Sequence, residues 1–249
     1  MSPDLTARRP TDGAMTQLQP AHRVGLNLLA VLVKDVADRV LAILGLAALS
    51  PLLAVIALAI RVDSPGPTFY RERRAGRRGR VFRIYKFRTM VVGAEYIGLG
   101  RNIARNDKRI TRVGKWLRRT SVDEIPQLVN VALGQMSIVG PRPAPFHHVA
   151  SYTDHQRRRL EVRPGITGWA QVNGRNSLSW EDRIELDIWY VDHWSPLIDL
   201  RILQRTPRAL LSGTDLYGPG GVTTDLRAIQ DQPEPPHANV GDPGTHGAA

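Results

Sequence analysis

The longest uninterrupted run of apolar residues extends from Val40 to Ile60, with no charged residue and with Ser50-Pro51 at its middle. A helix of this length can cross roughly 30 Å of hydrocarbon. Proline removes one helical hydrogen bond and clashes with the carbonyl four residues earlier, and a serine hydroxyl can bond to a carbonyl that is freed there. The pattern therefore predicts a membrane helix that bends at Ser50-Pro51.

Basic residues lie on both sides of this run. Arg23, Lys34 and Arg39 precede it, and a dense group of arginines follows it between residues 61 and 80. Because segments rich in lysine and arginine stay in the cytoplasm, both flanks favour the same side of the membrane. We therefore predict an interfacial lead-in and a re-entrant helix hairpin over residues 23–62. A single kinked span is the alternative.

A small β-hairpin is predicted after the membrane segment. The cluster Asp63–Pro67 should stop the helix and turn the chain into water. Residues 68–72 and 80–87 then combine aromatic and β-branched side chains, and two glycines within 75–79 permit a turn. The arginines near this turn fit a solvated edge that prevents sheet association, or contact with lipid headgroups.

Helical spacing follows from Asp107 to Leu133, where Ile110, Val113 and Leu117 share one stripe. A core-facing helix would show the same stripe, but the preceding apolar run favours an amphipathic helix on the membrane surface. Thr120-Ser121 interrupts the pattern, and Pro126 is tolerated only near a helix start. A second helix is therefore predicted to begin at 121–123.

Asp123 and Glu124 fall at the start of that second helix. The exposed amides and the positive end of the helix dipole favour an ionised carboxylate or a bound phosphate. Neighbouring side chains on a regular helix diverge by about 100°. Both can therefore serve one site only if one contacts a substrate and the other a metal beside it. Taken alone, such a pair is typical of an N-cap and its neighbour.

The last part of the apolar pattern, Trp180 to Leu211, predicts one or two amphipathic helices with a break near Ser195-Pro196. His147, His148 and His193 lack the spacing of a metal site and are interpreted as surface or helix-end residues.

Composition limits the picture further. A chain of 249 residues can bury one sizeable core, and its formal net charge of +11 suits nucleic acid, anionic lipid or a phosphate-bearing substrate. The sequence has no cysteine, which excludes disulfides and a thiolate nucleophile. Residues 1–20 lack the apolar segment of a cleavable leader, so we expect the protein to face the cytoplasm.

Five motifs occur in order: Ser64–Pro67, Lys86–Met90, Asp123–Leu128, Gly140–Pro143 and Arg163–Gly174. In this series the chain closely resembles the monotopic phosphoglycosyl transferases, bacterial sugar transferases that begin glycan assembly on polyprenyl phosphate. The resemblance covers residues 34–217. It implies an α+β, helix-dominated fold with a re-entrant membrane helix, amphipathic interfacial helices and a small β-hairpin. The expected organisation is a disordered tail (1–22), a membrane segment (23–62), a cytoplasmic catalytic domain (63–220) and a second disordered tail (221–249).

The resemblance also implies residue roles. Asp123 matches the nucleophile that attacks the β-phosphate of a nucleotide sugar, and Glu124 matches the residue that holds Mg²⁺. The other implied roles are phosphate binding by Arg118 and Arg142, a basic lining from Lys86 and Arg88, contacts to the donor from Gln171, Asn173 and Arg175 in an ordered loop, and the membrane helix break at Ser50-Pro51.

The implied reaction transfers a sugar 1-phosphate from a UDP-sugar to undecaprenyl phosphate at the inner leaflet of the bacterial cytoplasmic membrane, in exopolysaccharide assembly. A non-catalytic protein that binds anionic lipid is the alternative. A glycosyltransferase that releases nucleoside diphosphate is a third interpretation. Nucleic acid is not expected as a partner, because the basic residues are not interleaved with aromatics along a groove. The sequence does not identify the sugar, and a homodimer is compatible with a membrane surface without a coiled-coil repeat to indicate it.

Overall fold

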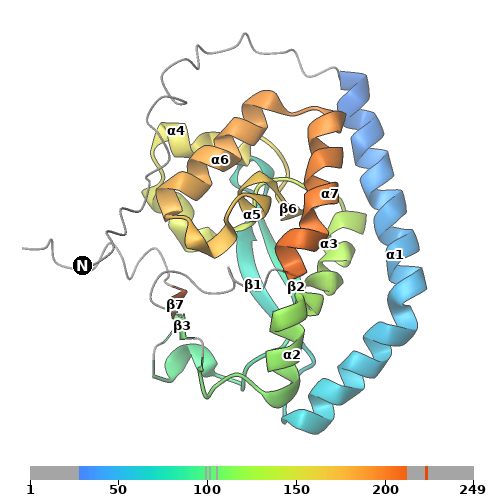
Figure 1. Cartoon of the computed structure of the whole chain (residues 1–249), viewed down its shortest axis with the longest axis vertical. Coiled ribbons are helices and arrows are strands. Elements are labelled where there is room, and N and C mark those ends of the chain that lie inside the picture. Colours follow the sequence, from blue (N-terminus) through green and yellow to red (C-terminus); the bar gives the residue numbers. More distant parts are fainter. Residues whose placement is uncertain (1–27, 99, 101, 105, 212–221, 224–249) are drawn as a thin grey trace, which may run out of the picture.

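The computed structural model describes residues 28–211 and 222–223, apart from positions 99, 101 and 105. Figure 1 shows a long bent helix, α1 (Leu28–Asp63), along one side of a mixed domain of short helices and strands. The α+β, helix-dominated class predicted from the sequence is confirmed. The predicted tail over residues 1–22 lies outside the described residues, as does the predicted tail over 221–249 except for 222–223. These two residues form the short strand β7 (Val222–Thr223), so the prediction of a disordered tail is wrong there.

Helix α1 is one continuous helix of 36 residues with Pro51 inside it. Proline 51 cannot donate to the carbonyl of Ala47, four residues earlier, and the Ser50 hydroxyl donates to that carbonyl at 2.8 Å instead. The helix bends in its middle part without folding back into two antiparallel arms (Figure 1). The bend and its serine contact are as expected, whereas the re-entrant path stays a prediction.

The predicted β-hairpin is confirmed. Strand β1 (Phe69–Ala75) pairs antiparallel with β2 (Val81–Phe87), so that Tyr70 faces Lys86 and Ala75 faces Val81. The 3₁₀ turn Arg77–Gly79 joins the strands. The short strand β5 (Ala144–Pro145) adds to the other edge of β1.

The segment 107–133 differs from the prediction of two α-helices. Residues 107–110 are not helical, because Asp107 and the backbone carbonyls of Ala94 and Asn102 bind the buried guanidinium of Arg109. Helix α2 (Arg112–Thr120) begins after Thr111, which caps it, and ends at Ser121 in a left-handed conformation. The second helix is a 3₁₀ helix, Val122–Gln127, followed by a short α3 (Leu128–Ala132).

The predicted loop 163–175 is also more regular than expected. Strand β6 (Gly165–Thr167) pairs in parallel with β4 (Ser137–Val139), and α5 (Trp169–Val172) follows it. A Cβ atom on Gly165 would lie 2.1 Å from the amide nitrogen of Gly140. The glycines in these two motifs therefore allow their backbones to cross, which is a packing role that loop composition alone did not distinguish.

Two helices lie on either side of the break near Ser195-Pro196, as predicted: α6 (Trp180–His193) before it and α7 (Pro196–Leu211) after it. His193 ends α6, whereas His148 is buried against Trp180 and is not the surface residue expected from the sequence. The remaining elements are β3 (Ile103–Ala104), which pairs with β7 (Val222–Thr223), and α4 (Asp154–Arg157), with 3₁₀ turns at Ala94–Tyr96, Phe146–Ser151, Arg158–Leu160 and Arg175–Ser177.

One side of α1 belongs to the core of the domain. Ala42 packs with Phe82 and Val131, and Ile60 packs with Phe87 and Leu117 further along the helix. The other side exposes large apolar side chains along the length of the helix, namely Leu29, Leu32, Val33, Val36, Val40, Leu41, Ile43, Leu44, Leu52, Val55, Leu58 and Val62. Such a continuous apolar surface is typical of a membrane contact.

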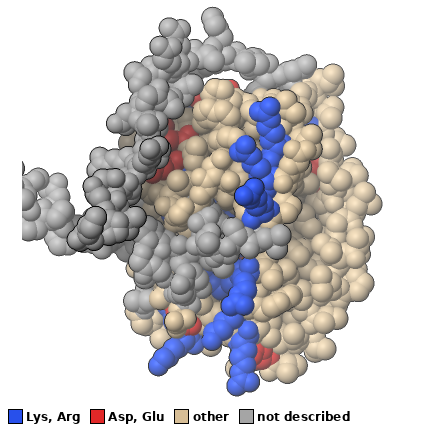
Figure 2. Space-filling model, viewed as in Figure 1, with Lys and Arg blue, Asp and Glu red and all other residues tan. Residues whose placement is uncertain are grey.

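A stripe of basic side chains lies beside this helix. Figure 2 shows Lys and Arg running down the viewed face, over the region of α7 and α2 in Figure 1. The exposed basic residues of these helices recur on one face of each: Arg201, Arg205 and Arg208 in α7, and Arg112, Lys115 and Arg119 in α2. Trp116 of α2 is also exposed. This combination suits the polar boundary of a bilayer.

Candidate active site

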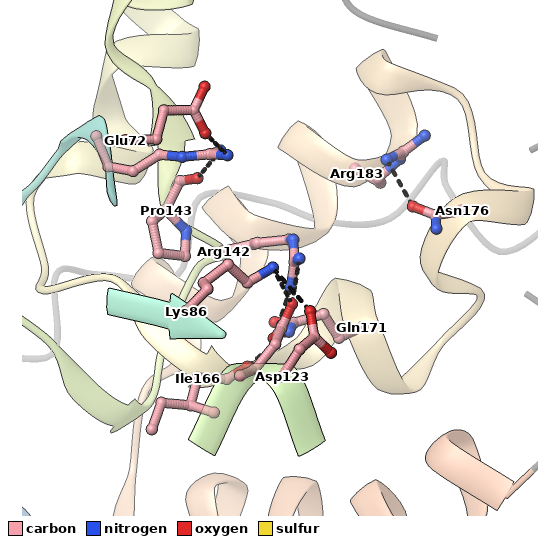
Figure 3. Close-up of polar contacts among 11 residues, drawn as sticks. Glu72, Lys86, Asp123, Arg142, Pro143, Ile166, Gln171, Asn176 and Arg183 are labelled. Carbon is pink, nitrogen blue, oxygen red and sulfur yellow. Dashed lines mark hydrogen bonds and ion pairs between the residues drawn. The ribbon is translucent and has the colours of Figure 1, made fainter. Parts of the chain in front are cut away.

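The carboxylates of Asp123 and Glu124 lie in the first turn of the 3₁₀ helix and are both buried. Asn130, on the following helix α3, fixes this region against β2: its side chain accepts from the Tyr85 amide and donates to the Arg83 carbonyl, each at 2.9 Å. The C-terminal half of β2 is thereby held beside Asp123, and Lys86 points at the carboxylate pair (Figure 3).

Two cations from different elements converge on this pair. Lys86 Nζ lies 2.8 Å from Glu124 Oε1 and 3.7 Å from Asp123 Oδ2. Arg142, in the loop after β4, donates to both Glu124 oxygens, at 2.7 and 3.3 Å. In Figure 3, Lys86 and Arg142 reach the carboxylate groups from above, and the backbone that carries Asp123 lies below them. Glu124 is therefore held by the two-pronged guanidinium of Arg142 and by the ammonium group of Lys86.

The two carboxylates differ electrostatically. Burial alone would raise the pKa of Glu124, but Arg142 and Lys86 outweigh it and hold that pKa well below its usual value. Burial raises the pKa of Asp123; Lys86 opposes this effect and the charge of Glu124 adds to it. The expectation that a helix dipole keeps Asp123 ionised is thus replaced by a balance between burial and the neighbouring cations.

Of the other two basic residues predicted for the site, Arg118 acts on Asp123 and Arg88 does not reach the carboxylates. Arg118, at the end of α2, acts on Asp123 electrostatically and lowers its pKa. Arg88 is buried and donates to the carbonyl oxygens of Ser64, at 2.8 Å, and Pro65. The structure therefore does not bring Arg88 to the carboxylates. Arg88 follows the end of β2 and binds the cluster Asp63–Pro67, so it holds the segment directly after α1 in place.

Of the residues expected to contact a donor, Gln171 lines the same cavity as Glu124. Its amide nitrogen donates to the Ile166 carbonyl at 2.8 Å, while its buried Oε1 has no hydrogen-bond partner among the described residues. Asn173 instead donates to the Trp169 carbonyl at 2.8 Å and accepts from Arg205. The side chain of Arg175 lies outside what the structure describes. Gln171 alone offers an acceptor for a ligand in this group.

A cavity of about 220 Å³ opens beside Glu124. Leu49, directly before the Ser50-Pro51 break in α1, lies on one side of it, and Gln171 lies on another. Most of its other lining side chains are apolar: Ile125, Leu128, Ile166, Val172, Ala209 and Leu210. An apolar chamber thus connects the buried carboxylate to the bend of the apolar helix.

Sequence reasoning missed two arginines that position Arg142. Arg74 of β1 donates to the Pro143 carbonyl at 3.0 Å, and Arg159 donates to the carbonyl of Arg142 itself at 3.0 Å. Arg159 is in turn paired with buried Asp187 of α6. These contacts join segments far apart in the sequence, and an arginine that binds a carbonyl leaves no periodic pattern to find.

The donor set can be tested against Mg²⁺, which takes oxygen ligands in octahedral geometry and is often held by one or two carboxylates together with substrate phosphates. No group of three or more potential ligand side chains is found within the described part of the chain. Glu124 can supply one carboxylate for this last arrangement, in which substrate phosphates complete the ligand set.

Comparison with known proteins decides the family. Residues 29–213 match the family model described as "Bacterial sugar transferase", which is most of the chain. The chain belongs to this family. One relative in the family is the "Uncharacterized sugar transferase EpsL" of Bacillus subtilis, which is 41% identical over 78% of this chain and 95% of that protein.

Two further relatives of the family carry names that state an activity. The "UDP-glucose:undecaprenyl-phosphate glucose-1-phosphate transferase" of Xanthomonas campestris is 43% identical over 75% of this chain and 40% of that protein. The "Undecaprenyl-phosphate galactose phosphotransferase" of Salmonella typhimurium is 39% identical over 72% of this chain and 40% of that protein. The chain therefore spans less than half the length of these two family members, but nearly all of EpsL.

Within the described residues, one helix, over Leu29–Asp63, is long and apolar enough to cross a membrane, with a mean hydropathy of 2.6 in its most apolar window. Only 11% of that window is buried within the protein. A core helix of a soluble domain would be mostly buried, so this low fraction favours contact with lipid.

Proposed function

We propose that the protein transfers a sugar 1-phosphate from a UDP-sugar to undecaprenyl phosphate and releases UMP. The observation that carries the proposal is the buried Asp123–Glu124 pair, with Lys86 and Arg142 directed at it from two elements and an apolar cavity leading to the bend of α1. Family membership and the names of its relatives support the same reaction class.

The first chemical step is assigned to Asp123. A carboxylate oxygen attacks the β-phosphorus, the bond from that phosphorus to the bridging oxygen breaks, and UMP leaves with the bonding electrons. The product on the enzyme is an aspartyl phosphosugar. In the second step, a phosphate oxygen of undecaprenyl phosphate attacks the same phosphorus. The bond to Asp123 breaks, and the free carboxylate returns.

Charge balance comes from the residues around the pair. Lys86 and Arg118 lower the pKa of Asp123 against the effect of burial, which favours the ionised nucleophile. Arg142 is a fork suited to phosphate oxygens, and it can exchange its contact with Glu124 for the donor diphosphate. When bound, Mg²⁺ would be held by Glu124 and the phosphates and would offset their negative charge.

The apolar cavity beside Glu124 suits the lipid acceptor. A polyprenyl chain that leaves the bilayer at the bend of α1 would pass Leu49 and bring its phosphate toward Glu124 and Asp123. Gln171 lines the same cavity with its unpartnered Oε1, which can accept from a sugar hydroxyl. The donor and acceptor would then meet over the carboxylate pair.

The lengths of the two halves of α1 support a re-entrant path. The uncharged segments on either side of the Ser50-Pro51 break, from 40 to 50 and from 51 to 60, each rise about 15 Å as helix. This is half of a hydrocarbon core of roughly 30 Å. Both segments can therefore reach the middle of the bilayer while their basic flanks, Arg39 and Arg61, stay at one surface, that of the cytoplasmic leaflet.

The test measures nucleotide release by the purified full-length protein with Mg²⁺, undecaprenyl phosphate and a panel that includes UDP-glucose and UDP-galactose. We expect UMP with at least one donor, and a loss of at least about 10³-fold in Asp123→Asn, because an amide cannot act as the nucleophile. Asp154→Asn, at an exposed position on α4, is the matched control and should retain activity.

A covalent step is tested separately by omitting the acceptor. Intact-protein mass spectrometry should show the mass of one sugar phosphate added to the wild type and nothing added to Asp123→Asn. Release of UDP rather than UMP, or full turnover by the Asp123→Asn variant, would contradict the proposal. A folded protein that binds anionic lipid but turns over no member of the donor panel would favour the non-catalytic alternative.

A further inference from the structure

A second hollow lies at the opposite end of the β-hairpin from the carboxylate pair. It has a volume of about 460 Å³ and is formed by the turn after β1, the loop after α3 and the start of α1. Strand β2 runs from Val81 at the hollow to Lys86 at the candidate active site, which separates the two by about 17 Å along the strand. The two sites are therefore distinct.

Guanidinium groups dominate the lining of this hollow. Arg77, Arg78 and Arg80 come from the turn and are all exposed, and Arg163 comes from the segment before β6. Among the described residues that line it, the single carboxylate is Asp35 of α1, and Arg163 is already paired with it. Three exposed arginines therefore remain without a neutralising carboxylate in the lining.

The backbone of Arg78 is held in an unfavourable conformation. Its φ of 56° and ψ of 30° lie in the left-handed region, which glycine occupies without cost and a residue with a Cβ occupies at a cost of about 1 kcal/mol. Gly79 next to it has a φ of 74°. An arginine at such a position costs stability, so its side chain is the feature that needs an explanation.

The rim of the hollow is apolar and lies beside the membrane helix. Leu133 is 61% exposed and Val81 is 42% exposed, and both line it. Asp35, which also lines it, precedes Val36 on the exposed apolar surface of α1. Exposed arginines, exposed apolar side chains and a bilayer-facing helix thus occur at one place. A soluble anion would make no use of the apolar rim.

We propose that this hollow binds the phosphate group of an anionic membrane lipid, with the acyl chains against Leu133 and Val81. Arginine forks match the oxygens of a phosphate, and a basic cluster beside a membrane segment attracts anionic headgroups. The site is independent of the transfer reaction at Asp123. It anchors the hairpin turn to the bilayer surface on a part of the domain that lies away from the catalytic carboxylates.

The test uses full-length protein in nanodiscs of phosphatidylcholine with a minor fraction of phosphatidylglycerol, and native mass spectrometry counts the lipids that stay bound. We expect the wild type to retain phosphatidylglycerol preferentially, and Arg78→Gly to lower this preference by about fivefold. Glycine suits the left-handed backbone, so the thermal stability of this variant should equal or exceed that of the wild type. Arg157→Gln, an exposed arginine outside the hollow, should match the wild type.

Each outcome bears on the proposal. Phosphatidylglycerol retention that falls in Arg78→Gly and falls further in an Arg77→Gln, Arg78→Gly, Arg80→Gln triple variant supports a lipid site, provided that millimolar inorganic phosphate does not displace the lipid. Binding of inorganic phosphate that depends on the same arginines, without a preference between the two lipids, would assign the hollow to free phosphate and overturn the lipid source. Equal retention in the wild type and the triple variant would overturn the site itself.

Discussion

The neighbouring carboxylates of Asp123 and Glu124 differ in their cation contacts and in the direction of their pKa shifts. Glu124 receives both strong cation contacts, from Arg142 at 2.7 Å and Lys86 at 2.8 Å, and its pKa is lowered despite its burial. Asp123 lies further from Lys86, at 3.7 Å, and burial raises its pKa. Both Glu124 oxygens thus contact cations, while Asp123 keeps an oxygen available for the proposed attack on a substrate phosphorus.

The raised pKa of Asp123 predicts the acidic side of the pH profile. Because the ionised carboxylate is the proposed nucleophile, kcat/KM for the donor should fall as the pH drops through that pKa. Lys86 is the largest influence that opposes the effect of burial, so Lys86→Met should raise the pKa further and move the acidic limb to higher pH. The measurement is kcat/KM against pH for the wild type and this variant.

A control separates this effect from a general loss of charge. Lys108→Met removes a lysine from an exposed position outside the site and should leave the limb in place. A Lys86→Met profile that drops equally at every pH, without a shift of its limb, would show that Lys86 acts on the bound donor rather than on the ionisation of Asp123.

Asp187, which pairs with Arg159 behind the Arg142 loop, gives a prediction for stability. Burial raises its pKa to about 6, with Arg159 opposing. The folded protein therefore holds a proton that the unfolded chain releases between about pH 4 and 6, and the free energy of unfolding should fall by up to about 3 kcal/mol as the pH rises through that window. Chemical denaturation at several pH values measures this slope.

The matched comparison is Asp187→Asn. This variant has no titrating group at the position and should lose that part of the pH dependence, although it leaves buried Arg159 without its charged partner and should be less stable overall. Glu181→Gln, an exposed position on the same helix, should keep the wild-type slope. An unchanged slope in Asp187→Asn would assign the pH dependence to other groups.

At the scale of elements, the break in α1 is the feature on which the topology depends. Ser50 satisfies the Ala47 carbonyl that Pro51 leaves without its helical donor. Pro51→Ala would restore that donor and straighten the helix, which should favour a complete span over a return to the same face. The chain has no cysteine, so single cysteines introduced at Ser2 and Val92 can report on each side without background.

In intact spheroplasts, a membrane-impermeant maleimide should leave both cysteines unlabelled in the wild-type background, since both flanks are proposed to be cytoplasmic. Permeabilised cells, in which both should react, provide the positive control. In Pro51→Ala, the cysteine at position 2 should gain labelling in intact spheroplasts. Labelling of that cysteine in the wild-type background would establish the single kinked span.

Elements that depend on local pattern could be predicted from the sequence, and those that depend on tertiary contact could not. The β-hairpin followed from two runs of aromatic and β-branched residues around two glycines, and the two C-terminal helices from apolar spacing and Ser195-Pro196. The helix expected from Ser121 became a 3₁₀ helix. Strand β6 escaped notice because a strand of three residues has too few positions to show a period.

The same distinction holds at the candidate site. Asp123, Glu124 and Arg142 came from motifs, and the structure brings them together. Arg88 belongs to a motif too, but its guanidinium serves the backbone near Ser64. Arg74 and Arg159, which hold the Arg142 loop, gave no signal in the sequence because carbonyls accept from any arginine that the fold brings near them.

At the scale of the whole molecule, α1 is part of the folded domain as well as the candidate membrane helix. Lys34 of α1 lies 2.6 Å from Asp199 of α7, and Asp38 accepts from Ser137. Ala42, Ile56 and Ile60 are buried in the same packing that encloses β2. The membrane segment and the carboxylate site are therefore fixed to one another.

Removal of α1 should consequently unfold the domain. A chain that begins at Ser64 would expose the faces of Phe87 and Leu117 that Ile60 covers, and we expect it to lack a cooperative thermal transition. Deletion of residues 1–22 should leave the transition of the detergent-solubilised protein in place. If the truncated chain that begins at Ser64 were soluble, showed a sharp thermal transition and released UMP, the domain would fold without α1.

The cavity that joins Glu124 to the bend of α1 also bears on how the rate should be described. If the acceptor reaches the carboxylates only from within one leaflet, its effective concentration is its mole fraction among the surrounding lipids rather than its amount per volume. Adding neutral phospholipid at a constant total quantity of undecaprenyl phosphate should then slow turnover by surface dilution, whereas the KM for the water-soluble UDP-sugar should stay the same.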